Sequence, residues 1–247
     1  MKALLRLFFR LLYHQFAFTY DLVAAVVSFG RWKDWVMSVI PFIEGNRILE
    51  IGHGPGHLQR ALLTFRHGSH GPDVLSGGQA RGMVAVAIDE SAPMSRLAKR
   101  NIASQPSKFA DAASPIYERA GVQANLTRGL AQYLPFSNDA FDTIVSTFPS
   151  EYIFEPQTLW EARRVLRHGG RLVVLPVALP RNRFLDWLFR VTGESPSDAI
   201  DIVKARLAKP FASAGFETEV QTLDLRSGIL LIILARRNEE LNVEKIT

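Results

Sequence analysis

The sequence predicts one three-layer α/β domain built on a mostly parallel, seven-stranded sheet with a C-terminal antiparallel hairpin. Apolar runs rich in β-formers alternate along the chain with segments of helical periodicity, which is typical of parallel sheets covered on both faces. The last two apolar runs are separated only by Arg226-Ser227-Gly228, as in a hairpin. A hydrophobic fraction of 47% is enough for one sizeable core.

The apolar runs account for seven strands. We expect them at residues 47–51, 83–88, 122–127, 141–147, 171–177, 216–225 and 229–236. The run 141–147 is almost continuous in β-formers, which is typical of a strand buried on both faces. Helical spacing predicts helices at 58–65, about 91–101, 159–166 and 199–214, the third of them ending in a C-cap at Gly169-Gly170.

Composition excludes several classes of function. The chain contains no cysteine, so disulfide frameworks, thiolate nucleophiles and cysteine-based metal sites are ruled out. The net charge of +5 is small and spread along the chain, and a nucleic-acid partner is not expected. His67, His70 and Asp73 lie in a glycine-rich stretch at 66–82, read as a loop that cannot fix ligand geometry, and no metal site is expected.

A cluster of glycines follows directly on the first strand, in the segment Glu50-Ile51-Gly52-His53-Gly54-Pro55-Gly56. Its spacing lacks the third glycine of a dinucleotide fingerprint, and no Lys-Ser/Thr pair makes it a P-loop. What remains is a bare turn before a helix N-terminus, where a carboxylate can approach the backbone. Glu50 offers an acceptor for a cationic group, and Asp89 ends the next strand as an acceptor for ribose hydroxyls. The expected ligand therefore combines an amino acid with a nucleoside.

Four segments in this order resemble class I S-adenosylmethionine-dependent methyltransferases of the type 11 (ubiquinone/menaquinone-biosynthesis-like) family. They are Glu50 to Gly56, Asp89-Glu90-Ser91 with Met94, Leu134-Pro135-Phe136 ahead of Phe141-Asp142, and Glu161 with Arg164 to Leu172. The resemblance covers roughly residues 47–177, over half of the chain. It implies a Rossmann-like fold, S-adenosyl-L-methionine as cofactor, and methyl transfer to a small, apolar or lipid-like acceptor such as a quinone.

The resemblance also implies roles for individual residues. The methionine part of the cofactor would lie on the glycine turn, which consists of Glu50, Gly52, His53, Gly54 and Gly56. Asp89 would bind the ribose, and the nucleoside would be lined by Glu90, Met94, Leu130 and Ala131. Thr147 would form the floor near the sulfonium, and no residue is assigned as catalytic.

Two further features concern the acceptor and the adenine. Glu151 and Tyr152 follow the fourth strand, where substrate-facing groups tend to lie, and we expect them to contact substrate. Family members usually carry an acidic residue at the position of Leu130, so adenine recognition here would rest on backbone and packing. The rival interpretations are a non-catalytic cofactor-binding or scaffold protein, favoured by Leu130, and an NAD(P)-dependent oxidoreductase, disfavoured by the glycine spacing.

The first residues form an apolar segment with a basic stripe. Lys2, Arg6, Arg10 and His14 interrupt it before it reaches the length of a membrane span or a secretory signal, and a cytoplasmic protein is expected. Such a helix must be covered, so three hypotheses remain: a lid that brings Tyr13 and Tyr20 to the site, peripheral membrane contact through residues 1–15, or a dimer contact. We expect this extension at 1–43, the methyltransferase domain at 44–237 and a polar tail at 238–247.

Overall fold

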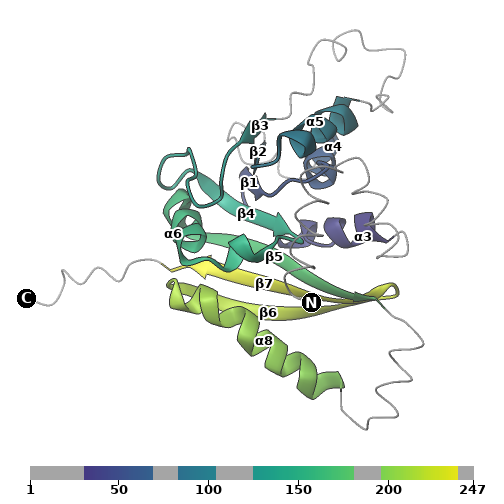
Figure 1. Ribbon diagram of the computed structural model, residues 1–247, viewed down its shortest axis with the longest axis vertical. Helices are drawn as coiled ribbons and strands as arrows, with labels where there is room; N and C mark the ends of the chain where they lie inside the picture. Colours follow the sequence, from purple (N-terminus) through teal and green to yellow (C-terminus); the bar gives the residue numbers. More distant parts are fainter. Residues whose placement is uncertain (1–30, 69–82, 104–124, 181–195, 239–247) are drawn as a thin grey trace, which may run out of the picture.

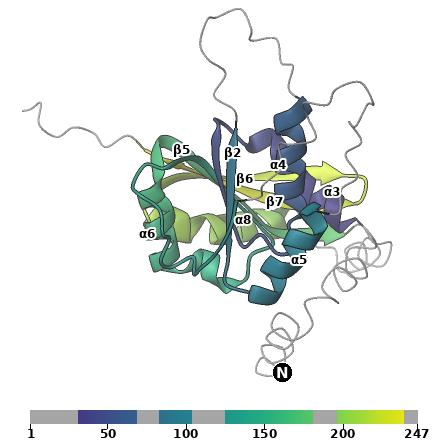
Figure 2. The ribbon, with the colours of Figure 1, turned by 90° about the horizontal axis from the view of Figure 1, so that it is seen from above.

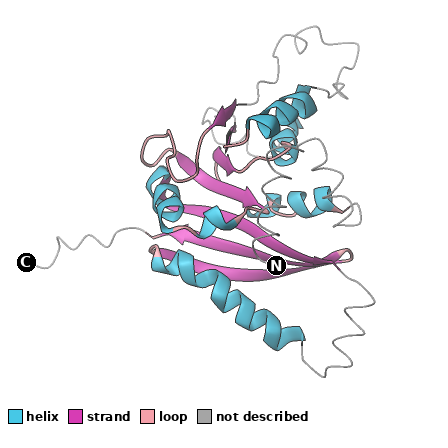
Figure 3. Cartoon of the chain, viewed as in Figure 1, coloured by secondary structure: helices cyan, strands magenta, loops and turns pink. Residues whose placement is uncertain are grey.

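The computed structural model describes residues 31–68, 83–103, 125–180 and 196–238. Its centre is a seven-stranded sheet with the order β3-β2-β1-β4-β5-β7-β6 (Figures 1 and 3). The strands are β1 (Arg47–Ile51), β2 (Val84–Asp89), β3 (Asn125–Arg128), β4 (Phe141–Thr147), β5 (Leu166–Pro180), β6 (Phe216–Leu225) and β7 (Gly228–Arg237). The first five strands pair in parallel, and β7 pairs antiparallel with both β5 and β6. The predicted fold class is thereby confirmed.

Helices cover both faces of the sheet (Figure 2). On one side lie α3 (Trp32–Met37), α4 (His57–Gly68) and α5 (Ala92–Ala103), and on the other α6 (Pro156–Val165) and α8 (Pro196–Ser213). Two short 3₁₀ helices complete the described structure: η2 (Ile40–Phe42) and η4 (Glu151–Phe154), which directly follows the end of β4. The result is the three-layer arrangement that buries a parallel sheet on both faces.

The register of the strands aligns their carboxyl ends. Ile51 pairs with Ile88, and Thr147 pairs with Leu175, so that β1, β2, β4 and β5 reach the same edge. In an open sheet of this order, β1 and β4 flank the point where the chain changes direction, and ligands bind outside the carboxyl ends there. The fold therefore places the glycine turn after β1 and the segment after β4 on either side of one crevice.

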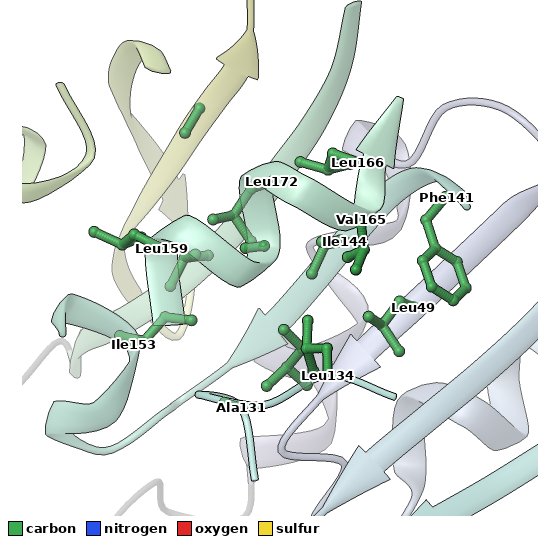
Figure 4. Close-up of a cluster of buried hydrophobic side chains, with 14 of the residues drawn as sticks. Leu49, Ala131, Leu134, Phe141, Ile144, Ile153, Leu159, Val165, Leu166 and Leu172 are labelled. Atoms are coloured by element: carbon green, nitrogen blue, oxygen red, sulfur yellow. The ribbon is translucent and has the colours of Figure 1, made fainter. Parts of the chain in front are cut away.

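Two hydrophobic clusters fix the layers. The cluster in Figure 4 joins the inner face of α6 to β1, β4 and β5 through side chains such as Leu159, Val165, Ile144 and Leu172, all of them fully buried. The second cluster packs α3 and α4 on the opposite face, with Trp35 among its buried members. Because both faces of β4 are covered, all but its last residue are buried, as its nearly continuous run of β-formers predicts.

One buried ion pair connects two of the sequence segments that resemble the methyltransferase family. The Glu161 carboxylate accepts hydrogen bonds from Arg164 Nε at 2.7 Å and from the backbone N–H of Leu134 at 2.7 Å. Arg164 also donates to the carbonyl oxygens of Leu134 and Phe136, at 3.0 and 2.8 Å. The arginine lowers the pKa of Glu161. These segments therefore fasten the loop after β3 to α6, which is a structural role.

The structure corrects the boundary between the helix expected at 159–166 and the strand expected at 171–177. α6 ends at Val165, and Leu166 already has extended backbone angles (φ −73°, ψ 137°), so the expected C-cap at Gly169-Gly170 is wrong. The glycines belong to β5 instead. A Cβ on Gly170 would lie 2.9 Å from the carbonyl oxygens of Arg167 and Asp142, which explains glycine at this position. The start of the expected third strand, at residues 122–124, lies outside the described residues.

Candidate cofactor and acceptor site

A cavity of about 740 Å³ opens at the carboxyl edge of the sheet, a size typical of small-molecule sites. Its walls come from the ends of β1, β2, β3 and β4 and from η4. Ten sequence-predicted site residues line it: Gly52, Gly54, Asp89, Glu90, Met94, Leu130, Ala131, Thr147, Glu151 and Tyr152. The topology therefore gathers side chains that are up to a hundred positions apart in the sequence into a single crevice.

The glycine turn presents bare backbone to this cavity. Gly54 has φ +49°, and a Cβ built on it would meet nothing within 4 Å, so the space beside it is open. Gly52 has φ +75°, and its side is approached by the Tyr152 hydroxyl, which would clash with a Cβ. Gly56 has another function: a Cβ there would lie 2.9 Å from Ala98 Cβ, so this glycine lets α5 pack closely. Gly52 and Gly54 thus face the cavity, and Gly56 does not line it.

Asp89 joins the glycine turn to the start of α5. Its Oδ2 accepts the N–H of Gly54 at 3.0 Å, and its Oδ1 accepts the N–H of Ser91 at 2.8 Å. The N-cap of α5 is Ser91, whose Oγ accepts the N–H of Met94 at 3.3 Å. Because each carboxylate oxygen has further lone pairs, Asp89 can hold the turn and still accept hydrogen bonds from a ligand hydroxyl.

Glu50 is buried directly beneath the turn, with 1% of its surface exposed. Among the residues that the structure describes, no group hydrogen-bonds to its Oε2. Burial raises the pKa of this carboxyl to about 8, although the side-chain amide of Gln59 partly opposes the shift without forming a well-aligned hydrogen bond. Glu50 does not itself line the cavity. A buried carboxyl with an unused oxygen is nevertheless suited to a cationic group entering from the turn.

His53 is held inside the turn. Its Nδ1 lies 2.8 Å from the carbonyl oxygen of Gly54, its Nε2 lies 3.5 Å from Ser95 Oγ, and only 3% of the residue is exposed. It does not line the cavity. These contacts favour support of the turn over direct contact with a ligand.

The part of the cavity where the sequence predicts the nucleoside is lined by α5 and by the loop after β3. Met94 is buried, and Leu130 stands 45% exposed beside it in the cavity wall. The side-chain amide of Gln132 donates to Glu155 Oε2 at 2.7 Å, and both residues line the same cavity. Sequence patterns did not indicate this pair, because residues 132 and 155 are brought together only by the packing of the loop against η4.

Aromatic side chains follow β4 in the wall of the cavity. Thr147 ends β4, and Phe148, Tyr152 and Phe154 follow it in the cavity wall. The Tyr152 hydroxyl lies 3.5 Å from both Ser146 Oγ and the carbonyl oxygen of Ile51, which places it over the glycine turn. Phe148 was not predicted from the sequence. Tyr13 and Tyr20, the other expected substrate residues, lie outside the described residues.

In the described part of the chain, no group of three or more histidine, aspartate or glutamate side chains is placed to hold a metal ion. No helix within the described ranges has the length and apolar character needed to cross a membrane.

The sequence of this chain matches known methyltransferases. The profile of the ubiE/COQ5 methyltransferase family matches residues 9–192, about three quarters of the chain. A demethylmenaquinone methyltransferase of Symbiobacterium thermophilum is 29% identical over 79% of this chain and 70% of its own length. A ubiquinone/menaquinone biosynthesis C-methyltransferase UbiE of Cellvibrio japonicus is 31% identical, and the match covers 70% of this chain but only 61% of that protein.

Solved structures share the fold. A protein from Methanococcus maripaludis described as a putative S-adenosyl-L-methionine-dependent methyltransferase aligns with a TM-score of 0.52 and 17% identity, covering 91% of this chain and 94% of that one. The magnesium protoporphyrin IX methyltransferase of Synechocystis, solved with S-adenosylhomocysteine, aligns with a TM-score of 0.51 and 14% identity over 89% and 88% of the two chains. By the family match and this fold, the chain belongs to the ubiE/COQ5 methyltransferase family of S-adenosylmethionine-dependent enzymes.

Proposed function

We propose that this protein transfers the methyl group of S-adenosylmethionine to a ring carbon of a quinone-like, lipid-soluble acceptor. The printed names of its relatives support this proposal, since they describe demethylmenaquinone methyltransferase and ubiquinone/menaquinone biosynthesis C-methyltransferase activities. The observation that carries it is the shape of the site. One cavity is lined both by polar groups, at the glycine turn and Asp89, and by the aromatic side chains of Phe148, Tyr152 and Phe154 that follow β4.

The polar groups at the glycine turn and Asp89 fit the cofactor. The open side of Gly54 leaves room for the methionine part, and the unused Oε2 of Glu50 suits its ammonium group. Asp89 lies where the next strand ends and is assigned to the ribose hydroxyls. When bound, S-adenosylmethionine supplies an electrophilic methyl on a sulfonium, so the protein's own part is alignment and exclusion of water.

Adenine recognition departs from the family pattern at Leu130. An apolar side chain there removes one acceptor for the adenine amino group, which is worth about 0.5–1.5 kcal/mol of affinity. Leu130 instead contributes a partly exposed apolar surface on which the purine can pack. Loss of a single hydrogen bond lowers affinity without abolishing binding, so Leu130 does not favour the alternative of a non-catalytic scaffold.

Methyl transfer to a defined acceptor tests the proposal. The full-length protein is incubated with methyl-labelled S-adenosylmethionine and a prenylated 1,4-naphthoquinol that lacks the ring methyl, and product is identified by mass and label. We expect label on a ring carbon and equimolar S-adenosylhomocysteine. Binding of S-adenosylhomocysteine with no transfer to this quinol or to a lipid extract would overturn the proposed acceptor, and absence of binding would overturn the cofactor site.

The N-terminal segment remains a separate proposal, since residues 1–15 lie outside the described residues. An apolar acceptor favours an apolar entrance, and the basic stripe of Lys2, Arg6 and Arg10 favours anionic membrane surfaces. Flotation of the full-length and 16–247 proteins with anionic vesicles separates membrane contact from a lid. If truncation changes neither flotation nor turnover on the quinol, both ideas are wrong.

A further inference from the structure

The residue after β4 has an unusual backbone. Phe148 has φ +49°, a left-handed conformation that is uncommon for a bulky side chain, and among the described non-glycine residues only Asp139 shares a positive φ. The conformation is held in place by the N–H of Phe148, which donates to the carbonyl oxygen of Leu175 at 2.7 Å. Such strained residues concentrate at functional sites, where the surrounding structure enforces a required side-chain position.

The side chain of Phe148 is held in a stacked position. The Phe148 ring lies on the indole of Trp32 with centroids 4.0 Å apart and planes at 29°. The ring of Trp35 stands 6.4 Å away from Phe148 at 47°, and its Nε1 donates to Ser227 Oγ at 2.9 Å, which fixes Trp35 against the turn between β6 and β7. Phe148 is partly exposed and lines the cavity together with Thr147, whereas Trp32, which backs the Phe148 ring, does not line it; this stacked pair is the aromatic wall.

Attack by a ring carbon has a geometric requirement that such a wall meets. A ring carbon attacks through the π-face, so the acceptor ring must lie across the line of the sulfonium–methyl bond. The π electrons form the new carbon–carbon bond, and the pair of the broken carbon–sulfur bond stays on sulfur. The ring carbon then gives its proton to solvent, which restores aromaticity. A flat protein surface on the far face of the acceptor holds it in this orientation.

We infer that Phe148, backed by Trp32, is the stacking surface for the planar ring of the acceptor, and that it selects flat bicyclic rings. This inference rests on the proposed function and adds the residue that orients the acceptor. A fused bicyclic ring covers more of a stacked aromatic wall than a monocyclic ring does, and offset aromatic pairs have a free-energy gain beyond the area that they bury.

Binding measurements test this inference without turnover. 1,4-Dihydroxynaphthalene is titrated under anaerobic conditions into the parent protein saturated with S-adenosylhomocysteine, alongside Phe148→Leu, Phe148→Tyr and Trp32→Leu. The control is Trp160→Leu on α6, a tryptophan that is 57% exposed and does not line this cavity. We expect Phe148→Leu and Trp32→Leu to weaken naphthalene binding about 3- to 10-fold, and Phe148→Tyr and Trp160→Leu to leave it unchanged.

The outcomes separate this inference from the proposed function. S-adenosylhomocysteine affinity should stay within about two-fold in all variants, and 1,4-hydroquinone, a monocyclic ring, should bind more weakly than the naphthalene. If Phe148→Leu and Trp32→Leu bind the naphthalene as the parent does, or if the parent does not bind it, the stacking wall is refuted even where the labelled-methyl assay succeeds. If the wall binds the naphthalene but no methyl is transferred, the proposed function fails and the binding site stands.

Discussion

Replacement of the buried Glu50 by glutamine should stabilise the protein, and more so as the pH rises. An unfolded glutamate titrates near 4.5, whereas burial raises the pKa of Glu50 to about 8 in the folded protein. Between these values the unfolded chain is ionised and the folded chain binds an extra proton, so unfolding becomes easier as the pH rises. Each pH unit is worth about 1.4 kcal/mol. Relative to acidic solution, the free energy of unfolding is therefore lower by about 3 kcal/mol at pH 7 and by up to about 5 kcal/mol above pH 8.

Glu50→Gln keeps the size of the side chain and removes this ionisation. Urea unfolding of both proteins at pH 5, 6, 7 and 8 should show a stability difference in favour of the variant that grows by about 1 kcal/mol per pH unit. The variant should also lose affinity for S-adenosylhomocysteine, since glutamine cannot ionise to pair with the ammonium group of the ligand. A difference in stability that is the same at every pH would refute the pKa assigned to this carboxyl.

Asp142 provides a control whose effect on stability depends on pH in the opposite direction. Burial alone would raise its pKa, but the backbone N–H groups of Arg47 and Asn46 and the guanidinium of Arg167 together lower it. Its contribution to stability is therefore complete above the pKa of an unfolded aspartate and is lost as the pH falls through the lowered value. Asp142→Asn should be less stable than the parent at pH 7, and the gap should narrow below about pH 4.

Three further substitutions probe the glycine turn, Asp89 and the ion pair that fastens the loop after β3. Gly54→Val should abolish S-adenosylhomocysteine binding in calorimetry, because the side chain fills the open space of the turn, at a fold cost of about 1–2 kcal/mol for the positive φ; retained affinity would place the cofactor elsewhere. Asp89→Ala should weaken the same binding by about 1–3 kcal/mol, and unchanged binding would remove Asp89 from the site. Glu161→Ala should lower the free energy of unfolding by about 3 kcal/mol, since Arg164 and the N–H of Leu134 lose a buried partner. A loss below about 1 kcal/mol in urea unfolding would contradict that role.

The elements predicted most accurately from the sequence are the strands at the centre of the sheet. β1 and β4 have the expected bounds, because each is a short run rich in β-formers that polar or glycine-containing turn segments delimit. The prediction of where α6 ends was wrong because a local sequence pattern misled it. Gly169-Gly170 has the composition of a helix C-cap, and only the packing of β5 against the backbone of Asp142 reveals that Gly170 permits a close approach instead.

The candidate site likewise contains residues that the sequence predicts and residues that it does not. The turn at Gly52 and Gly54 and the strand-end position of Asp89 follow from local chemistry, and these residues do line the cavity. Phe148 does not follow from the sequence, because no pattern indicates a left-handed phenylalanine or its partner Trp32 more than a hundred residues away. The pairing of Gln132 with Glu155 also depends on how a loop packs, which local propensity does not determine.

The hydrogen bond between Trp35 and Ser227 joins a residue inside the region that the family profile matches to one outside it. The family profile ends at residue 192, whereas Ser227 lies in the turn between β6 and β7, beyond the matched region. The aromatic group formed by Phe148, Trp32 and Trp35 is therefore braced by a residue outside the matched region. A substitution at Ser227 would act on Trp35 rather than on the glycine turn or Asp89, so the two parts of the site can be perturbed separately.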